Sequence, residues 1–141
     1  MVQRYILSDY AKLIEIWKKA AKDSHHFLSK ESFELIKSKL VEYFNSLEVY
    51  VYKKAGKDVA FMGVKDDKVD MLFCDPDYQG QGIGTFMLNY AIKLLNVRFV
   101  DVHEDNSAAI EFYKKNGFHE VARTEHDIFK YHTIHLSYEL V

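Results

Sequence analysis

Residues 78–84 read Tyr-Gln-Gly-Gln-Gly-Ile-Gly, and they stand between an apolar strand pattern and an amphipathic helix pattern. Gly80, Gly82 and Gly84 alternate with other residues. Glycine lets backbone N–H groups crowd around a ligand where a Cβ would collide. Because a helix begins at the end of the segment, its unpaired N–H groups and the positive end of its dipole face the same spot. The segment therefore predicts an anion site, most naturally one for phosphate.

The elements around this segment follow from hydrophobic periodicity. The helix after it runs from Ile83 to about Leu95 with apolar residues at a 3.6-residue period. Before it, residues 47–53, 59–64 and 69–74 have strand patterns separated by short polar turns. Such short connections predict an antiparallel meander.

The remainder of the chain adds strands and helices at both ends. The sequence predicts a strand from Val2 to Leu7, a helix capped by Ser8, and a second helix from about Ser29 with Leu28 and Phe33 as a hydrophobic staple. The expected buried stripes are, for the first helix, Leu13, Ile14, Trp17, Ala20 and Ala21, and for the second, Phe33, Ile36, Leu40 and Phe44.

After the glycine segment and its helix, residues 99–102 are expected to form a strand parallel to its neighbour, because a helix connects the two. Asn106 is expected to cap a helix that ends at Gly117, and strands follow at 118–124 and 131–140. The predicted order is β-α-α-β-β-β-α-β-α-β-β. It indicates an α+β (mixed α/β) fold, with a single mixed sheet and helices on its faces.

Size and composition favour one globular enzyme-sized domain spanning residues 1–141. The formal net charge of −2 does not favour nucleic acid or an anionic membrane as a partner. No apolar run approaches 18 residues and no signal-peptide core is evident, so a cytoplasmic location is expected. Cys74 is the single cysteine, and the seven histidines lack the spacing of a zinc protease, so no metal is expected.

Two common phosphate motifs fit the glycine segment poorly. A P-loop would continue with Gly-Lys-Ser/Thr, which is absent. The dinucleotide fingerprint needs G-x-G-x-x-G, whereas these glycines give G-x-G-x-G, and Asp101 is an unconvincing ribose-binding acid.

Two other motifs match a known family. The spacing Gln79-x-x-Gly82-x-Gly84 resembles the Q/R-x-x-G-x-G/A signature of the GNAT superfamily of N-acetyltransferases, which use acetyl-CoA. The segment from Asn106 to Phe118 looks like the family's N-x-x-A-x-x-F-Y-x-x-x-G-F block. The specific motifs lie within residues 69–118, while the order of elements matches over essentially the whole chain.

The resemblance implies a cofactor site and a splayed sheet. In the family two central strands, here 69–74 and 98–103, splay apart, and pantetheine inserts between them much as an added strand would. Phe73 and Cys74 are then the expected backbone contacts, and Asn106 also contacts the cofactor. The CoA pyrophosphate is expected on Gln79, Gly80, Gln81, Gly82, Gly84 and Thr85. Cys74 is expected to be a small buried residue rather than a nucleophile.

The resemblance also implies catalytic roles. Tyr113 matches the tyrosine that protonates the departing CoA thiolate in many members, and a phenol is a suitable acid for this step. Asp70 lies in a strand that resembles the one carrying the general base of histone acetylases in the superfamily. Burial inside an apolar strand would raise its pKa. A structural or substrate-orienting role for Asp70 stays open.

The acceptor side is less specified. His103 and Glu104 are rivals for the base and candidate acceptor-binding residues, although small bacterial members often have asparagine near position 103. His25 is expected to border the acceptor pocket, and Asp127 and Tyr131 are further candidates. The expected activity is acetyl transfer to a primary amine, of a small molecule or a protein, by direct attack in a ternary complex. The alternative is a non-catalytic acyl-CoA-binding or sensor domain. A monomer or a homodimer is expected.

Overall fold

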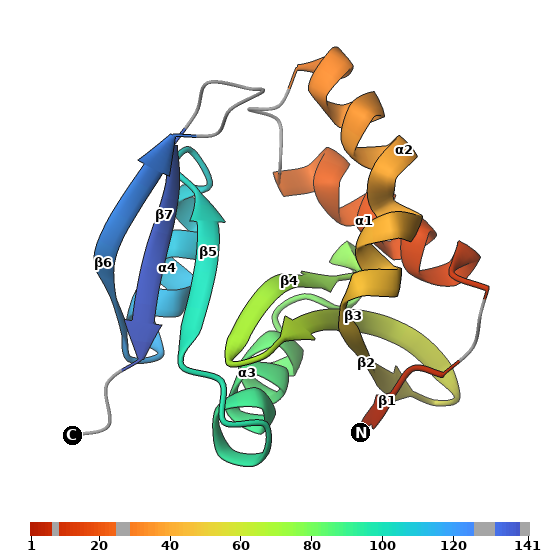
Figure 1. Ribbon diagram of the computed structural model, residues 1–141. Helices are drawn as coiled ribbons and strands as arrows, with labels where there is room; N and C mark the ends of the chain where they lie inside the picture. Colours follow the sequence, from red (N-terminus) through yellow and green to blue (C-terminus); the bar gives the residue numbers. More distant parts are fainter. Residues whose placement is uncertain (7–8, 25–28, 126–131, 139–141) are drawn as a thin grey trace.

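The computed structural model describes residues 1–6, 9–24, 29–125 and 132–138. Its elements follow in this order (Figure 1): β1 (Val2–Arg4), α1 (Ala11–Ser24), α2 (Lys30–Ser46), β2 (Glu48–Lys54), β3 (Lys57–Lys65), β4 (Lys68–Cys74), the 3-10 turn η1 (Pro76–Tyr78), α3 (Ile83–Leu94), β5 (Phe99–His103), α4 (Ser107–Lys115), β6 (Phe118–Glu125) and β7 (His132–Tyr138). The predicted order of helices and strands is confirmed. The first strand is shorter than expected, because it ends at Arg4.

The strands form one seven-stranded sheet in the order β1-β2-β3-β4-β5-β7-β6. All neighbours are antiparallel except β4 and β5, which are parallel. The predicted meander is therefore β2-β3-β4, and the fold class is confirmed. The sequence did not indicate that β7 enters the sheet between β5 and β6, next to β5.

The central parallel pair separates soon after it begins. Only Lys68↔Phe99 and Val69↔Val100 pair across β4 and β5. On its other edge β4 keeps pairing with β3, but the register shifts between Val69 and Met71, so that Asp70 is the extra residue of a β-bulge. A bulge bends its strand and increases the local twist. Figure 1 shows the two halves of the sheet diverging from this point, which confirms the expected splay.

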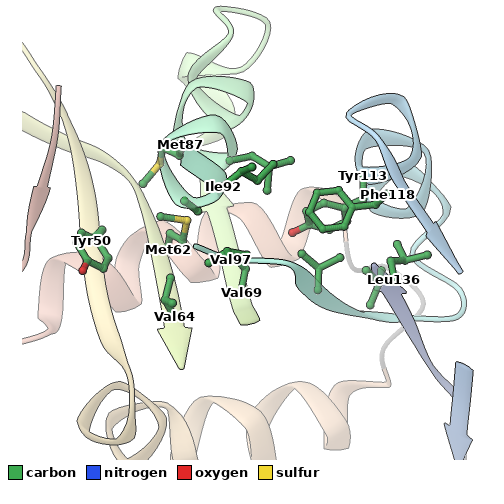
Figure 2. Packing of buried hydrophobic residues seen from close by; sticks show 14 of the residues in the cluster. Tyr50, Met62, Val64, Val69, Met87, Ile92, Val97, Tyr113, Phe118 and Leu136 are labelled. Atoms are coloured by element: carbon green, nitrogen blue, oxygen red, sulfur yellow. The ribbon is translucent and has the colours of Figure 1, made fainter. Parts of the chain in front are cut away.

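The two faces of the sheet carry separate cores. The first cluster joins α3 and α4 to residues such as Met62, Val100 and Leu136 (Figure 2). The second joins α1 and α2 to residues such as Val51 and Phe61. Successive strand residues point to opposite faces, so β2 and β3 contribute alternately to both clusters. Figure 1 shows α1 and α2 over the β1–β4 half of the sheet, while α4 lies behind β5, β7 and β6.

The N-terminal helices largely follow their sequence pattern. In α1 the buried residues are Leu13, Ile16, Trp17, Ala20 and Ala21. Ile14 was placed in this stripe but is only partly buried, because it lies about 100° around the helix from Leu13. The predicted cap Ser8 and staple residue Leu28 lie outside the described residues. The Asp9 side chain instead accepts the Ala11 N–H, at 2.9 Å.

In the part of the chain that the structure describes, no helix is long and apolar enough to cross a membrane.

Candidate active site

A cavity of about 700 Å³ lies where β4 and β5 have separated. Its wall comes from α1, α2, β4, the glycine segment, β5 and the first turns of α4. Most residues predicted for the site lie on this wall: Asp70, Phe73, Cys74, Gln79, Gly80, Gly82, Gly84, Thr85, His103, Asn106 and Tyr113. The splay therefore brings residues of β4 and the glycine segment together with residues of β5 and α4.

Two of the predicted residues that the structure describes, Gln81 and Glu104, are not on the wall. The Gln81 side chain lies in the exposed part of the loop, where it accepts a hydrogen bond from Lys54. Glu104 turns toward β7, since its carboxylate lies 3.0 Å from His132 Nδ1 and its N–H donates to the His132 carbonyl. His25, like Asp127 and Tyr131, lies outside the described residues. The neighbouring His103 is on the wall, where its Nδ1 accepts the Asp105 N–H at 3.0 Å.

The three positions of the segment require glycine for different reasons. Gly80 and Gly82 both have φ of 78°, in the left-handed region that favours glycine. A Cβ added to either would meet nothing within 4 Å, so space lies beside the backbone there. At Gly84 a Cβ would lie 3.4 Å from Phe112 Cζ, so this glycine allows α3 to approach α4.

The start of α3 suits an anion. Gly82 is its N-cap residue and offers no side-chain hydrogen bond to the first turn. The first N–H groups of a helix have no partner within the helix and carry partial positive charge. Together with the space beside Gly80 and Gly82, this end of the cavity fits a phosphate group that contacts the backbone closely.

The strand-to-loop junction is fixed by Asp75, which is 8% exposed. Its side chain accepts the Asp77 N–H at 3.0 Å and lies 3.0 Å from Lys19 Nζ of α1. Burial alone would raise the pKa of Asp75, but the bond from Asp77 and the Lys19 ammonium outweigh it and hold the pKa below its usual range. The carboxylate therefore stays charged and ties η1 to α1.

The β4 wall presents a carboxylate and a thiol. The Asp70 side chain is 28% exposed and lies 3.3 Å from Lys68 Nζ, so it is not buried in the strand as the sequence pattern had implied. The bulge is the reason, because it turns this residue out of the regular alternation. Cys74 is half-buried, and burial, with a smaller effect of Asp75, raises the pKa of its thiol to about 11.

The α4 wall presents Tyr113 and Asn106. Tyr113 is 7% exposed and packs between Phe112 and Phe118, with ring centroids at 5.3 and 5.7 Å. Burial raises the pKa of Tyr113 well above its ordinary value of 10. In Figure 2 its hydroxyl points away from α4, toward the side of α3. The Asn106 side chain accepts the Ala109 N–H at 3.2 Å, which confirms its predicted role as helix cap.

Sequence reasoning missed part of the wall. Trp17 of α1 and Ile36 of α2 line the cavity, although both had been assigned to the core, and Tyr43 of α2, which had been given no role, lines it as well. Asp101 also lines it. The available signal was the period of two along the strand, which places Asp101 two residues before His103, on the same face of β5.

The cradle at Gly80 and Gly82 and the extended gap between β4 and β5 fit a long ligand that carries a phosphate group, and a carboxylate and a buried phenol lie on the same wall. The family model described as "Acetyltransferase (GNAT) domain" matches residues 45–120. The chain belongs to the GNAT superfamily and is an acetyl-CoA-dependent N-acetyltransferase.

Individual relatives agree with this assignment. The chain is 33% identical over 117 residues to peptidyl-lysine N-acetyltransferase YjaB of Salmonella typhimurium, covering 82% of this chain and 81% of that protein. The solution structure of apo YjaB from Escherichia coli superposes with a TM-score of 0.88 at 27% identity, over 98% of this chain and 96% of that one.

A more distant structure shares the fold and contains the cofactor. The PaiA N-acetyltransferase of Thermoplasma acidophilum, solved in complex with coenzyme A, superposes with a TM-score of 0.70 at 21% identity, over 98% of this chain and 99% of that one. None of these comparisons supports the alternative of a non-catalytic binding domain.

Proposed function

We propose that acetyl-CoA lies along the cavity with its pyrophosphate on the backbone of residues 79–85 and its pantetheine arm beside Phe73 and Cys74 of β4. Two observations and one general property of strand edges support this placement. The cradle has room for a ligand at Gly80 and Gly82. The edge of β4 beyond Val69 has no β5 partner in the register. Backbone groups on such an edge can pair with an extended ligand.

The chemistry we propose is direct transfer. Asp70, or a water held by it, takes a proton from the acceptor ammonium, and the neutral amine forms its new bond to the thioester carbonyl carbon. Backbone N–H groups of the splayed strand polarise the carbonyl oxygen. The nitrogen gives its second proton to solvent water as the carbon–sulfur bond breaks, and Tyr113 gives its proton to the departing sulfur. The products are the amide and the CoA thiol, and solvent restores both side chains.

A covalent route through Cys74 is not part of the proposal. The thiolate is the reactive form of cysteine. With a pKa of about 11, Cys74 is almost wholly protonated at neutral pH. Its role is to form the wall beside the pantetheine arm.

For the acceptor we propose a lysine side chain of a polypeptide. The relatives from Salmonella and Escherichia coli are named peptidyl-lysine N-acetyltransferases. The observation that carries the proposal in this chain is the wall itself: Trp17, Ile36 and Tyr43 line the same cavity as the carboxylates Asp70 and Asp101. That combination suits an alkyl stem ending in an ammonium group. A cytoplasmic location and a monomeric or dimeric state stay predictions.

The variant Tyr113→Phe tests the proposed acid. We expect acetyl-CoA to bind with unchanged affinity, while kcat falls by about a hundredfold, because general acid catalysis typically contributes that much or more. Calorimetry with acetyl-CoA and thiol release with a lysine peptide measure the two quantities. Since burial raises the pKa of Tyr113, wild-type kcat/KM has no basic limb from this residue below about pH 10.

Tyr78→Phe is the matched control, since Tyr78 also lines the cavity but has no proposed proton to give. Its kcat is expected to stay within about twofold of wild type. Unchanged turnover in Tyr113→Phe would remove Tyr113 as the acid. The acceptor is tested separately by comparing a lysine peptide, a polyamine and an arylalkylamine, and a preference for either small amine would refute the peptide assignment.

A further inference from the structure

A chain of charged and polar side chains runs from the cavity across four strands. Lys68 Nζ lies 3.3 Å from Asp70 Oδ1 and 2.8 Å from Asp101 Oδ2. The other oxygen of Asp101 lies 2.6 Å from His135 Nδ1, and His135 Nε2 lies 2.8 Å from Thr124 Oγ1. Each side chain in this chain therefore contacts the next one through a polar atom.

The register of the sheet builds this chain. Lys68 pairs with Phe99, two residues before Asp101, and Asp101 stands directly opposite His135. Residues two apart on a strand share a face, so Lys68, Asp101 and His135 lie on one face of the sheet. This is the face opposite α4, since Val100 and Leu136 point into the cluster on that side. Asp70 and Asp101 reach the cavity wall from it.

Lys68 is a permanent cation between the two carboxylates. Its hydrogen bond to Asp101, together with the nearby charges of Asp70 and Asp101, raises its pKa in spite of burial. It therefore stays protonated at any pH where the reaction runs and cannot accept a proton. The exposed fractions of the Lys68, Asp70 and Asp101 side chains are 37%, 28% and 22%, so solvent screens these contacts only in part.

Asp70 depends on this chain more than a regular strand residue would. It is the bulged residue of β4, and β5 offers it no pairing beyond Val69. A bulged residue leaves the regular ladder, so the backbone on its own does not fix the direction of its carboxylate. The ammonium of Lys68 does so, and Asp101 with His135 in turn fixes Lys68.

We propose that Lys68, Asp101 and His135 are positioning residues that hold the Asp70 carboxylate directed at the acceptor amine. The inference rests on the proposed role of Asp70 as general base. It gives Asp101 of β5 and His135 of β7 a role that they exert through Lys68 of β4, and neither Lys68 nor His135 touches the reacting atoms.

The test is a 13C NMR titration of the Asp70 carboxyl in the full-length protein. In Lys68→Met the midpoint is expected to rise by about 1 pH unit, because a cation next to the carboxylate is lost. In Asp101→Asn it is expected to fall, because a neighbouring anion is lost and Lys68 is released toward Asp70. Lys68→Arg keeps the charge and restores the wild-type midpoint. Lys65→Met, an exposed lysine opposite Lys68 in register, leaves it unchanged.

Kinetics with acetyl-CoA and an Nα-acetyl-lysine peptide complete the test. Lys68→Met, Asp101→Asn and His135→Ala are expected to lower kcat about tenfold with little change in KM for acetyl-CoA, because the base is misdirected while the donor site is intact. The acid limb of the pH profile should follow the NMR midpoints. Lys68→Arg and Lys65→Met retain wild-type kcat.

Midpoints that do not move in opposite directions in Lys68→Met and Asp101→Asn overturn the inference, even if both variants lose thermal stability. Unchanged kcat in all three variants also overturns it. A wild-type protein that acetylates no amine would refute the proposed function instead. The titration would still show whether Lys68 and Asp101 act on the Asp70 carboxylate.

Discussion

Gly80 and Gly82 show how a single backbone conformation prepares a site. Both lie at φ of 78°, and beside each the space for a side chain is empty. Gly56, in the turn between β2 and β3, has the same φ and the same empty surroundings, but it does not line the cavity. Comparing substitutions at Gly82 and Gly56 therefore distinguishes the effect of backbone strain from the effect of ligand contact.

For Gly82→Ala and Gly56→Ala we expect similar losses of stability, about 1–2 kcal/mol each, from the left-handed backbone. Only Gly82→Ala should weaken acetyl-CoA binding, by about tenfold, because its Cβ enters the space proposed for the pyrophosphate. Urea denaturation and calorimetry measure the two effects. Equal acetyl-CoA affinity in both variants would contradict the proposed cradle.

Asp75 gives a residue-scale prediction about pH. Its folded-state pKa lies below the ordinary value, so its contribution to stability is complete above the unfolded pKa of about 3.9 and is lost as the pH falls through the folded pKa. We expect Asp75→Asn to cost about 1 kcal/mol at pH 7, a modest value because Lys19 is 44% exposed. Below about pH 3 the difference from wild type should shrink toward zero.

Asp77→Asn is the matched control for this measurement. Asp77 also lies near Lys19, at 3.2 Å, but its side chain is 75% exposed. Its replacement is expected to change stability by less than about 0.5 kcal/mol. Urea midpoints of the wild type, Asp75→Asn and Asp77→Asn, measured at pH 7 and below about pH 3, test this prediction. An effect of Asp75→Asn that does not depend on pH would refute the charge-based explanation.

At the scale of elements, the separation of β4 from β5 is the feature that creates the cavity. The bulge at Asp70 bends β4, and only two residue pairs hold the parallel strands together. The sheet therefore keeps its hydrogen bonding at one end and opens an unpaired edge at the other. The same opening supplies the cavity and places α4, with Tyr113, across from β4.

Hydrogen exchange tests this element directly. When acetyl-CoA binds, we expect amides of residues 70–74 and 101–103 to exchange more slowly by about tenfold or more, because backbone groups on the open edges gain partners. Amides of β2, paired on both sides by β1 and β3, should not change. Protection confined to residues 79–85 would contradict insertion of the pantetheine arm between the strands.

At the scale of the molecule, two cores on opposite faces hold one divided sheet. Phe44 of α2 is 1% exposed and contacts Phe61 of β3 edge-on, with ring centroids 5.5 Å apart. Phe44→Ala should therefore lower the free energy of unfolding by about 3–5 kcal/mol. Val41 of the same helix is 45% exposed, and Val41→Ala should change it by less than about 0.5 kcal/mol.

Urea denaturation of these two variants measures how far the helical layer of α1 and α2 supports the whole fold. Small and similar decreases in the free energy of unfolding of Phe44→Ala and Val41→Ala would mean that α2 contributes little to the global stability. Loss of cooperativity in Phe44→Ala, seen as a lower m-value, would instead show that the two cores unfold separately.

Local patterns predicted much of this architecture. The 3.6-residue period of α3, the alternation in β2 to β4, and the cap at Asn106 each depend on residues within a few positions of one another, and each is confirmed. The glycine segment and the Asn106–Phe118 block are contiguous motifs, so they identified the family without a structure. Strand ends and the Ile14 position were less accurate, since burial at the edge of a helix stripe depends on the neighbour it meets.

The sequence by itself determined the order of elements and the family, and it predicted the acetyl-CoA cradle, because these depend on short-range periodicity and contiguous residues. Only the tertiary structure decided what surrounds Asp70. Its chain of partners joins Lys68 to Asp101 and Asp101 to His135, residues 33 and 34 positions apart, through the bulge of β4 and the insertion of β7 beside β5. Strand order and register are set by packing over the whole sheet, and no local pattern specifies them.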